Sequence, residues 1–227
     1  MSEHPTGRRF DAVVFDLSGV VIASAFDAIA DTVSGAASRD EALALLLGPY
    51  GEDTDHVWHR VERGEVPITD WIAWIGEQTA AAGITIDWEA FGSMLGRLTV
   101  HDVIVDRIRS LRAEGYLTAL CTNNVKEGSK SWRELLPVDE LFDAVVDSSE
   151  VGMRKPDPRI YRHTLDLIGV EDAARAVFLD DHPGNVAGAE RAGLAGLLVG
   201  DPAEAIIALD HLLAGTPASE PTSEWRG

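Results

Sequence analysis

The chain of 227 residues carries 38 acidic and 19 basic side chains, a net charge of −19, and 45% of its residues are hydrophobic. This length is enough for a full hydrophobic core and an inserted unit, whereas so acidic a surface repels phosphate backbones and argues against nucleic-acid binding. No apolar run reaches the length of a membrane span, and a single cysteine, Cys121, excludes an internal disulfide. We therefore expect a cytoplasmic protein, monomeric or weakly dimeric, without nucleic-acid or membrane partners.

Five short runs rich in valine and leucine predict the strands of a buried parallel sheet, because each run is apolar on both faces. These runs are Ala12–Phe15, Leu117–Cys121, Ala144–Val146, Ala176–Leu179 and Gly196–Val199. Helical patterns separate the later runs, over Val103–Ala113, Pro158–Ile168 and Asn185–Ala192. Alternation of strands and helices favours a doubly wound, Rossmann-like α/β fold.

The gap between the first two runs is about a hundred residues long, far more than one crossover helix needs. Helical patterns recur in this gap, and no strand-like alternation of any length does. The patterns cover Ala25–Ser34, Glu41–Leu47, His56–Arg63, Thr69–Ala82 and Trp88–Leu98. We therefore predict a small helical cap domain over residues 23–98, inserted after the first strand of an α/β core made of residues 9–22 and 99–215. The polar ends, residues 1–8 and 216–227, are expected to be disordered.

Polar side chains follow the predicted strands at the points where they end. In an open parallel sheet, ligands bind just beyond the carboxyl ends of the strands. The side chains expected to meet at that edge are Asp16, Ser18, Thr122, Asn123, Lys155, Asp180 and Asp181. Taken singly, each aspartate or threonine has a simpler interpretation as a turn residue or helix cap, and Lys155 as a solvated lysine. Their joint occurrence at strand ends favours a functional site.

These residue types suit phosphate chemistry around a magnesium ion. Asp16 and the Asp180–Asp181 pair supply hard oxygen ligands, and their like charges would repel without a cation among them. A carboxylate that faces a metal-bound phosphate can attack it and form an aspartyl-phosphate. The Thr122 hydroxyl can hold phosphate oxygens, and the Lys155 ammonium can neutralise charge on the transferring group.

Four stretches resemble, in order, the motifs of the haloacid dehalogenase superfamily. They are VVFDLSGV, LCTNN, GMRKPDPRIY and VFLDDHPGNVAGA. The resemblance covers the whole α/β core, and the predicted insertion lies where members with a small helical cap carry it. The segment VERGEVPITDW, together with GMRKPDPRIY, is similar to the branch that contains sugar-phosphate phosphatases such as α-glucose-1-phosphate phosphatase.

The resemblance implies a Mg²⁺ site and a phosphate site. The implied metal ligands are Asp16, which is also the implied nucleophile, the backbone carbonyl of Ser18, and Asp181, with Asp180 close by. Thr122 would bind phosphate, and Lys155 would bridge nucleophile and phosphate. Further candidates are Asn123 and Asn185 in support of these groups, and Arg63, Trp58 and His59 of the cap as substrate contacts.

One position departs from the superfamily pattern. Most of its phosphatases carry a second aspartate two residues after the nucleophile, which protonates the leaving oxygen and then activates water. Here that position is Ser18, and general acid–base help is typically worth about 10²–10⁴-fold. Candidates for the replacement are His182, the cap residues His56, His59 and Glu62, and the substrate itself.

We therefore predict a Mg²⁺-dependent phosphomonoesterase that hydrolyses a small phosphorylated metabolite through an aspartyl-phosphate on Asp16. One alternative, motivated by Ser18, is a weakly active or inactive protein that binds phosphorylated ligands. A second alternative is a 2-haloacid dehalogenase. It is disfavoured because dehalogenases of this kind work without Mg²⁺ and do not need the paired acids Asp180–Asp181.

Overall fold

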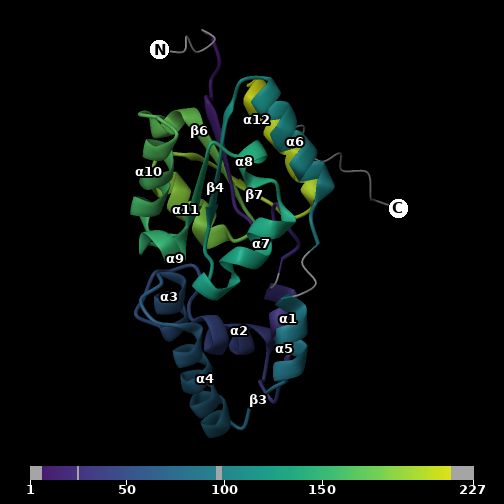
Figure 1. The fold of residues 1–227 in the computed structure, drawn as a ribbon, viewed down its shortest axis with the longest axis vertical. Helices are drawn as coiled ribbons and strands as arrows, with labels where there is room; N and C mark the ends of the chain where they lie inside the picture. The colour runs from purple at the N-terminus through teal and green to yellow at the C-terminus, as the bar shows by residue number, and fades with distance from the viewer. Residues whose placement is uncertain (1–6, 25, 96–98, 216–227) are drawn as a thin grey trace, which may run out of the picture.

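A five-stranded parallel sheet forms the centre of the protein (Figure 1), in a computed structural model that describes residues 7–24, 26–95 and 99–215. The strands follow the spatial order β5-β4-β1-β6-β7. Their bounds are β1 Ala12–Phe15, β4 Leu117–Thr122, β5 Ala144–Asp147, β6 Ala176–Asp180 and β7 Ala195–Leu198. The predicted doubly wound α/β fold is confirmed, and each strand lies within one residue of its predicted bounds.

Strand β1 occupies the middle of the sheet, because parallel partners flank it on both sides. Ala12 pairs with Leu117 of β4 and with Ala176 of β6. Alternate side chains of β1 enter two different hydrophobic clusters: Val13 and Phe15 one, Ala12 and Val14 the other. Both faces of the strand are therefore covered, as its uninterrupted apolar sequence predicts.

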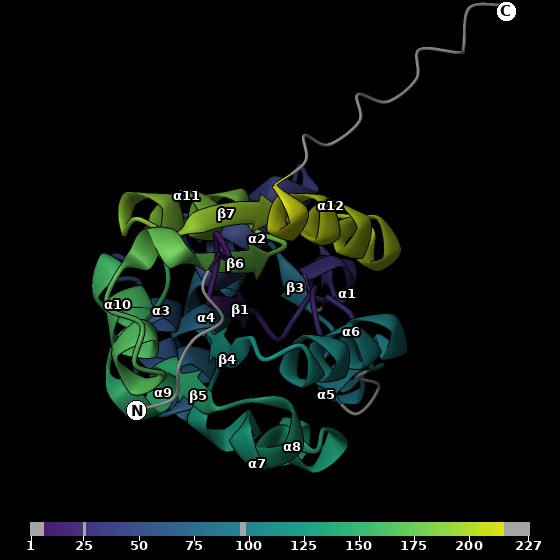
Figure 2. The same ribbon diagram turned by 90° about the horizontal axis from the view of Figure 1, so that it is seen from above.

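Two pairs of helices cover the two faces of the sheet (Figure 2). On one face lie α6 (Asp102–Ala113) and α12 (Pro202–Ala214), and on the other lie α10 (Pro158–Leu167) and α11 (Pro183–Arg191). Helix α12 was not among the predicted helices. Short elements that carry too few turns for a periodic pattern complete this part of the chain. They are η1 (Lys126–Gly128), α7 (Ser129–Leu135), α8 (Val138–Leu141), α9 (Ser148–Val151) and η2 (Ala173–Arg175).

Five helices of the segment between β1 and β4 gather at one end of the sheet (Figure 1). They are α1 (Phe26–Asp31), α2 (Arg39–Leu47), α3 (Val57–Glu62), α4 (Ile68–Ala82) and α5 (Trp88–Leu95). Their apolar side chains form a third hydrophobic cluster around Trp71, which is 0% exposed. We propose that this segment is the cap domain of residues 23–98, since it has a hydrophobic cluster of its own.

Two short strands correct the prediction for this segment. Helix α1 ends at Asp31, and the residues beyond it form β2 (Val33–Ser34), which pairs with β3 (Thr85–Ile86) as an antiparallel ladder. The predicted helix over Ala25–Ser34 was therefore too long, and the prediction that the cap contains helices without strands was wrong. Two-residue strands are too short to produce a recognisable alternation.

The two connections between the cap segment and the sheet run side by side. The backbone N–H of Ala23 donates to the carbonyl of Thr99 at 2.8 Å, and that of His101 donates to Val21 at 2.9 Å. Residues 25 and 96–98, at the edges of two predicted cap helices, lie outside the described part of the chain, as do residues 1–6 and 216–227. Arg8 falls in the stretch expected to be disordered, yet its guanidinium lies 4.4 Å from the ring centroid of Tyr116. Within the described residues, no helix is both long and apolar enough to span a membrane.

Candidate active site

Asp16 follows β1 directly and is held at the carboxyl end of the sheet. Its backbone N–H donates to the Leu179 carbonyl of β6 at 2.9 Å, so the ladder continues one residue beyond the strand. The backbone N–H of Leu17 donates to Asp16 Oδ1 at 2.6 Å. The Asp16 carboxylate is thus placed where a parallel sheet positions reactive groups.

Lys155 lies between two of the predicted carboxylates. Its Nζ is 2.7 Å from Asp16 Oδ1 and 2.6 Å from Asp180 Oδ2, and the lysine side chain is fully buried. The loop that carries Lys155 is fixed to the end of β4 by Asn123. The Asn123 amide accepts from the Lys155 N–H at 2.7 Å and donates to the Lys155 carbonyl at 3.0 Å. The ends of β1 and β6 therefore meet at the Lys155 ammonium, and the end of β4 holds the backbone of the same residue.

Asp180 is fixed from the side of α11 as well. Its Oδ1 accepts from the backbone N–H of His182 at 2.8 Å and from Asn185 Nδ2 at 3.0 Å. The carbonyl of Asn185 in turn accepts from the buried Tyr161 hydroxyl at 2.7 Å. His182 caps α11, because its Nδ1 accepts from the N–H of Gly184 at 3.1 Å. Asn185 therefore supports the site, as the resemblance implied.

Three carboxylates come close enough to share a cation. Asp16, Asp180 and Asp181 each offer one oxygen, and these oxygens lie within 4.8 Å of one another. Three negative groups face the single ammonium of Lys155, and a divalent cation would offset this imbalance. The all-oxygen donor set fits Mg²⁺ or another hard cation and does not suit a soft one.

The turn after β1 brings Gly19 against Asp181. Gly19 has a φ of +82°, and a Cβ built there would lie 1.9 Å from Asp181 Oδ2. Only glycine fits, both for its backbone conformation and for the space. The loop that carries Ser18 therefore lies directly against the carboxylate cluster.

Burial and neighbouring charges together shift the pKa values of these groups. Burial raises the pKa of Asp16 well above its usual value, and the nearby Lys155 ammonium opposes that rise. Burial and the neighbouring Asp180 raise the pKa of Asp181 to about 6. For Lys155, burial alone would lower the pKa, but Asp16 and Asp180 outweigh it and raise the pKa. The ammonium therefore stays charged at neutral pH.

Two hollows flank the carboxylate cluster. Asp16, Ser18, Thr122 and Asn123 line a cavity of about 280 Å³ together with cap side chains that include Glu62. Gly19, Asp181 and His182 line a second, more open hollow of about 650 Å³. The first is lined by the predicted nucleophile, Asp16, and by Thr122 and Asn123, two of the four predicted phosphate-binding residues, whereas Lys155 and Arg63 are not in its lining.

Arg63 is a predicted site residue that the structure pairs away from the carboxylate cluster. Its guanidinium donates to Glu65 Oε1 at 2.6 Å and pairs with Asp53 at 2.5 Å, and neither hollow includes Arg63 in its lining. The buried arginine near the site is instead Arg154. Its Nε donates to Glu62 Oε2 at 2.7 Å, and the Tyr50 hydroxyl donates to Glu62 Oε1 at 3.1 Å. Sequence reasoning missed Arg154, although it precedes Lys155, because adjacency does not reveal burial.

The candidate replacements for the acid–base aspartate occupy different places. Glu62 shares the cavity with Asp16, whereas His182 lines the neighbouring hollow. His56 and His59 line neither hollow: His56 Nδ1 accepts from the N–H of Trp58, and His59 Nδ1 accepts from the N–H of Thr54. Of the four, Glu62 alone is placed in the cavity that holds Asp16.

This fold and arrangement define a known class of enzyme. A family model of haloacid dehalogenase-like hydrolases matches residues 10–193, so the chain belongs to this family and is a hydrolase. A HAD family enzyme from Bacteroides thetaiotaomicron, solved as a magnesium complex, matches with a TM-score of 0.61 and 18% identity over 88% of this chain and 98% of the other. At that identity the likeness shows the fold alone.

Relatives of known name include phosphatases. The chain is 33% identical to a phosphoglycolate phosphatase of Cereibacter sphaeroides, over 80% of this chain and 81% of the relative. It is 30% identical to a sesquiterpene phosphatase of Aspergillus oryzae, over 85% of this chain and 91% of the relative. It is 29% identical to Bifunctional epoxide hydrolase 2 of Sus scrofa over 93% of this chain, which spans 41% of that protein. The predicted relationship to phosphatases of this superfamily is confirmed, and the narrower resemblance to the α-glucose-1-phosphate phosphatase branch stays a prediction.

Proposed function

We propose that the protein is a phosphomonoesterase that uses Asp16 as its nucleophile. The observation that carries this proposal is the position of Lys155 Nζ, 2.7 Å from Asp16 and 2.6 Å from Asp180. A buried cation beside a carboxylate at the edge of a cavity suits the attack of that carboxylate on an anionic group, since the cation offsets the charge repulsion.

The reaction would proceed in two displacements. An Asp16 oxygen forms a bond to phosphorus while the phosphorus–oxygen bond to the leaving group breaks, and the leaving oxygen takes up a proton. Water then attacks the aspartyl-phosphate, loses a proton, and releases inorganic phosphate and the free Asp16 carboxylate. Thr122 and Asn123, which line the same cavity, are proposed to hold the phosphoryl oxygens during both steps.

We propose Mg²⁺ as the cofactor, held by Asp16, Asp181 and the backbone carbonyl of Ser18, with Asp180 close by. The three carboxylates within 4.8 Å of one another support this set. The ion would polarise the phosphoryl oxygens and neutralise their charge. The Asp180–Asp181 pair also counts against the dehalogenase alternative.

Ser18 leaves this mechanism without its usual proton donor. Ser18 lines the cavity at the position of the usual aspartate, and a serine hydroxyl is too weak an acid for that role near neutral pH. We propose Glu62 as its replacement, because it is the candidate that shares the cavity with Asp16. Ser18 also supports the second candidate function, a slow or inactive protein that binds phosphorylated ligands.

The substrate is proposed to be a small phosphorylated compound, as for the two phosphatase relatives. Because those relatives are named for chemically different substrates, their names do not indicate which class this chain takes. A cytoplasmic location and a monomer or weak homodimer remain part of the proposal. Cys121 is free and buried, which suits a reducing compartment.

The test measures phosphate release from an activated aryl phosphate with and without Mg²⁺. Asp16→Asn should abolish release, since an amide is not a nucleophile at phosphorus, and removal of divalent ions with a chelator should do the same. The matched control is Asp166→Asn, the same change at an exposed position of α10, which should retain the wild-type rate. Full activity of Asp16→Asn would overturn the proposed nucleophile.

A further inference from the structure

The walls of the cavity beside Asp16 are largely hydrophobic. The apolar and aromatic side chains that line it include Ile29, Leu47, Trp58, Ile68 and Phe91 from the cap segment and Trp132 from α7. Its volume of about 280 Å³ is near the lower end for small-molecule sites, about 300–1,000 Å³. A cavity with such walls favours a ligand that carries apolar surface.

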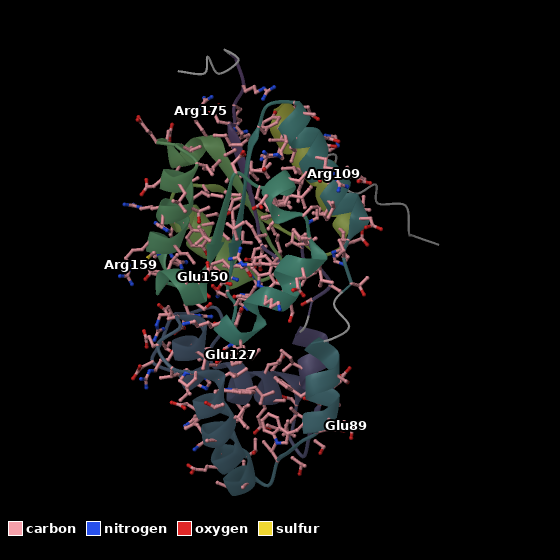
Figure 3. All side chains as sticks on the ribbon, in the orientation of Figure 1. Glu89, Arg109, Glu127, Glu150, Arg159 and Arg175 are labelled. Carbon is pink, nitrogen blue, oxygen red and sulfur yellow. The ribbon has the colours of Figure 1, made fainter. Side chains whose placement is uncertain are left out.

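The charged groups in the same lining are carboxylates. They are Asp16, Glu62 and Glu127, and no lysine or arginine is among the described residues that line the cavity. Glu127 lies where the core meets the cap helices (Figure 3), and its Oε1 accepts from the backbone N–H of Ile68 at 3.2 Å. Lys155, the nearby cation, is fully buried against Asp16 and Asp180. A second anionic group on the substrate would therefore find no basic partner in the cavity.

Packing of the cap side chains holds the apolar walls in place. Trp71 donates from Nε1 to the Leu46 carbonyl at 2.9 Å, and its ring lies 5.7 Å from that of Phe91 and 5.0 Å from that of Trp58. Leu47 and Phe91 are 2% and 8% exposed. The apolar side chains are therefore anchored from behind, and a ligand does not have to order them on binding.

We infer that the cavity receives the leaving group of an apolar phosphomonoester, an alkyl or aryl phosphate without a second anionic group. The phosphoryl group lies at Asp16 and Thr122, and the chain extends between the cap side chains and Trp132. This inference rests on the proposed function, and it names the substrate class that the apolar walls and the lack of a basic lining residue select.

Two matched comparisons of substrates test the inference. In the first, kcat/KM is measured with Mg²⁺ for ethyl, butyl and hexyl phosphate, and it should rise about four-fold for each added methylene until the cavity is full. In the second, phosphoglycolate is compared with propyl phosphate, which has nearly the same size without the carboxylate. Propyl phosphate should be preferred at least about ten-fold, because the carboxylate of phosphoglycolate meets carboxylates and no basic side chain in the lining.

A matched pair of variants locates the effect. Ile68 and Ile72 are both in α4, but Ile68 lines the cavity, whereas Ile72 is 41% exposed and does not. Ile68→Ala should reduce the hexyl-to-ethyl ratio of kcat/KM by about 5–20-fold, because the cavity wall loses apolar contact. Ile72→Ala should leave that ratio unchanged.

A binding measurement separates failure of this inference from failure of the proposed function. Affinities of ethyl-, butyl- and hexylphosphonate, which cannot be hydrolysed, are measured by calorimetry with Mg²⁺. If affinity rises with chain length and no phosphate ester is turned over, the substrate class stands and the catalytic proposal fails. If phosphate is released but phosphoglycolate is preferred over propyl phosphate, the inference is overturned and the phosphatase stands. If the protein shows no turnover and its affinity does not rise with chain length, both the inference and the proposed function are overturned.

Discussion

Replacing Glu62 with glutamine is expected to destabilise the fold strongly, because it removes the closest and most buried carboxylate partner of the buried Arg154 charge. The Arg154 Nε and Glu62 Oε2 atoms are 2.7 Å apart, and the two side chains are 0% and 2% exposed. Removing one member of such a pair typically costs about 3–5 kcal/mol. The guanidinium would keep the Glu52 carbonyl, the Asp53 carboxylate 3.9 Å away and the Tyr50 ring, whose centroid lies 5.1 Å away. We therefore expect a cost at the lower end of that range, about 3 kcal/mol.

The assay is urea unfolding, with the free energy extrapolated to water. The chain offers a matched pair at its surface: Arg109 Nε and Glu140 Oε1 are also 2.7 Å apart, but their side chains are 47% and 56% exposed. Arg109 lies on the outer surface in Figure 3. Glu140→Gln should leave the unfolding midpoint unchanged within error, because solvent screens an exposed pair. The two ion pairs thus have the same distance between nitrogen and oxygen and differ in burial.

A double variant completes the comparison. Glu62→Leu combined with Arg154→Met removes both charges, and it should recover most of the stability that either single change loses. If Glu62→Gln shifts the unfolding midpoint no more than Glu140→Gln does, the reasoning from burial is refuted. If the double variant is less stable than both single variants, the penalty does not come from an unpaired charge.

Three further predictions address the site and its surroundings. Because Glu62 is proposed to supply the proton, Ser18→Asp should leave kcat for phosphate release nearly unchanged, and a rise of about 10²–10⁴-fold would show that no group of the wild-type protein fills that role. Gly19→Ala should increase the Mg²⁺ concentration needed for half-maximal activity, because the new Cβ would displace Asp181; a normal Mg²⁺ titration contradicts this. Burial lowers the pKa of His59 from 6.5 to about 3, so between these values the unfolded chain binds a proton that the folded chain does not. The free energy of unfolding should therefore decrease as the pH is lowered through that window, by up to about 1.4 kcal/mol per pH unit. In urea unfolding from pH 7.5 to 4.5, the free energy of unfolding of His59→Gln should decrease less steeply than that of the wild type.

The sheet could be predicted closely because each strand is a short apolar run that ends in a polar group. The cap strands could not, because β2 and β3 contain two residues each and depend on contact between segments about fifty residues apart. The same limit applies to α7 to α9, whose four to seven residues are too few for a helical period.

Within the candidate site, strand ends were a reliable guide to position. The carboxyl ends of parallel strands meet at one edge, so Asp16 and Asp180 had to be neighbours once the sheet was correct. The two arginines near Glu62 were harder to assign. Arg63 adjoins Glu62 in sequence but turns to Asp53 and Glu65, whereas Arg154 reaches Glu62 from 92 positions away. Local sequence contains no information about that tertiary contact.

The central position of β1 has a consequence for how the protein is made. The strand that ends at Asp16 pairs with residues 117–120 and 176–179, so at about 5–20 residues per second a ribosome completes its second neighbour roughly ten to thirty seconds after β1 itself. Until then this apolar strand has an unsatisfied edge. Asp16 is therefore synthesised well before the strands that complete its surroundings.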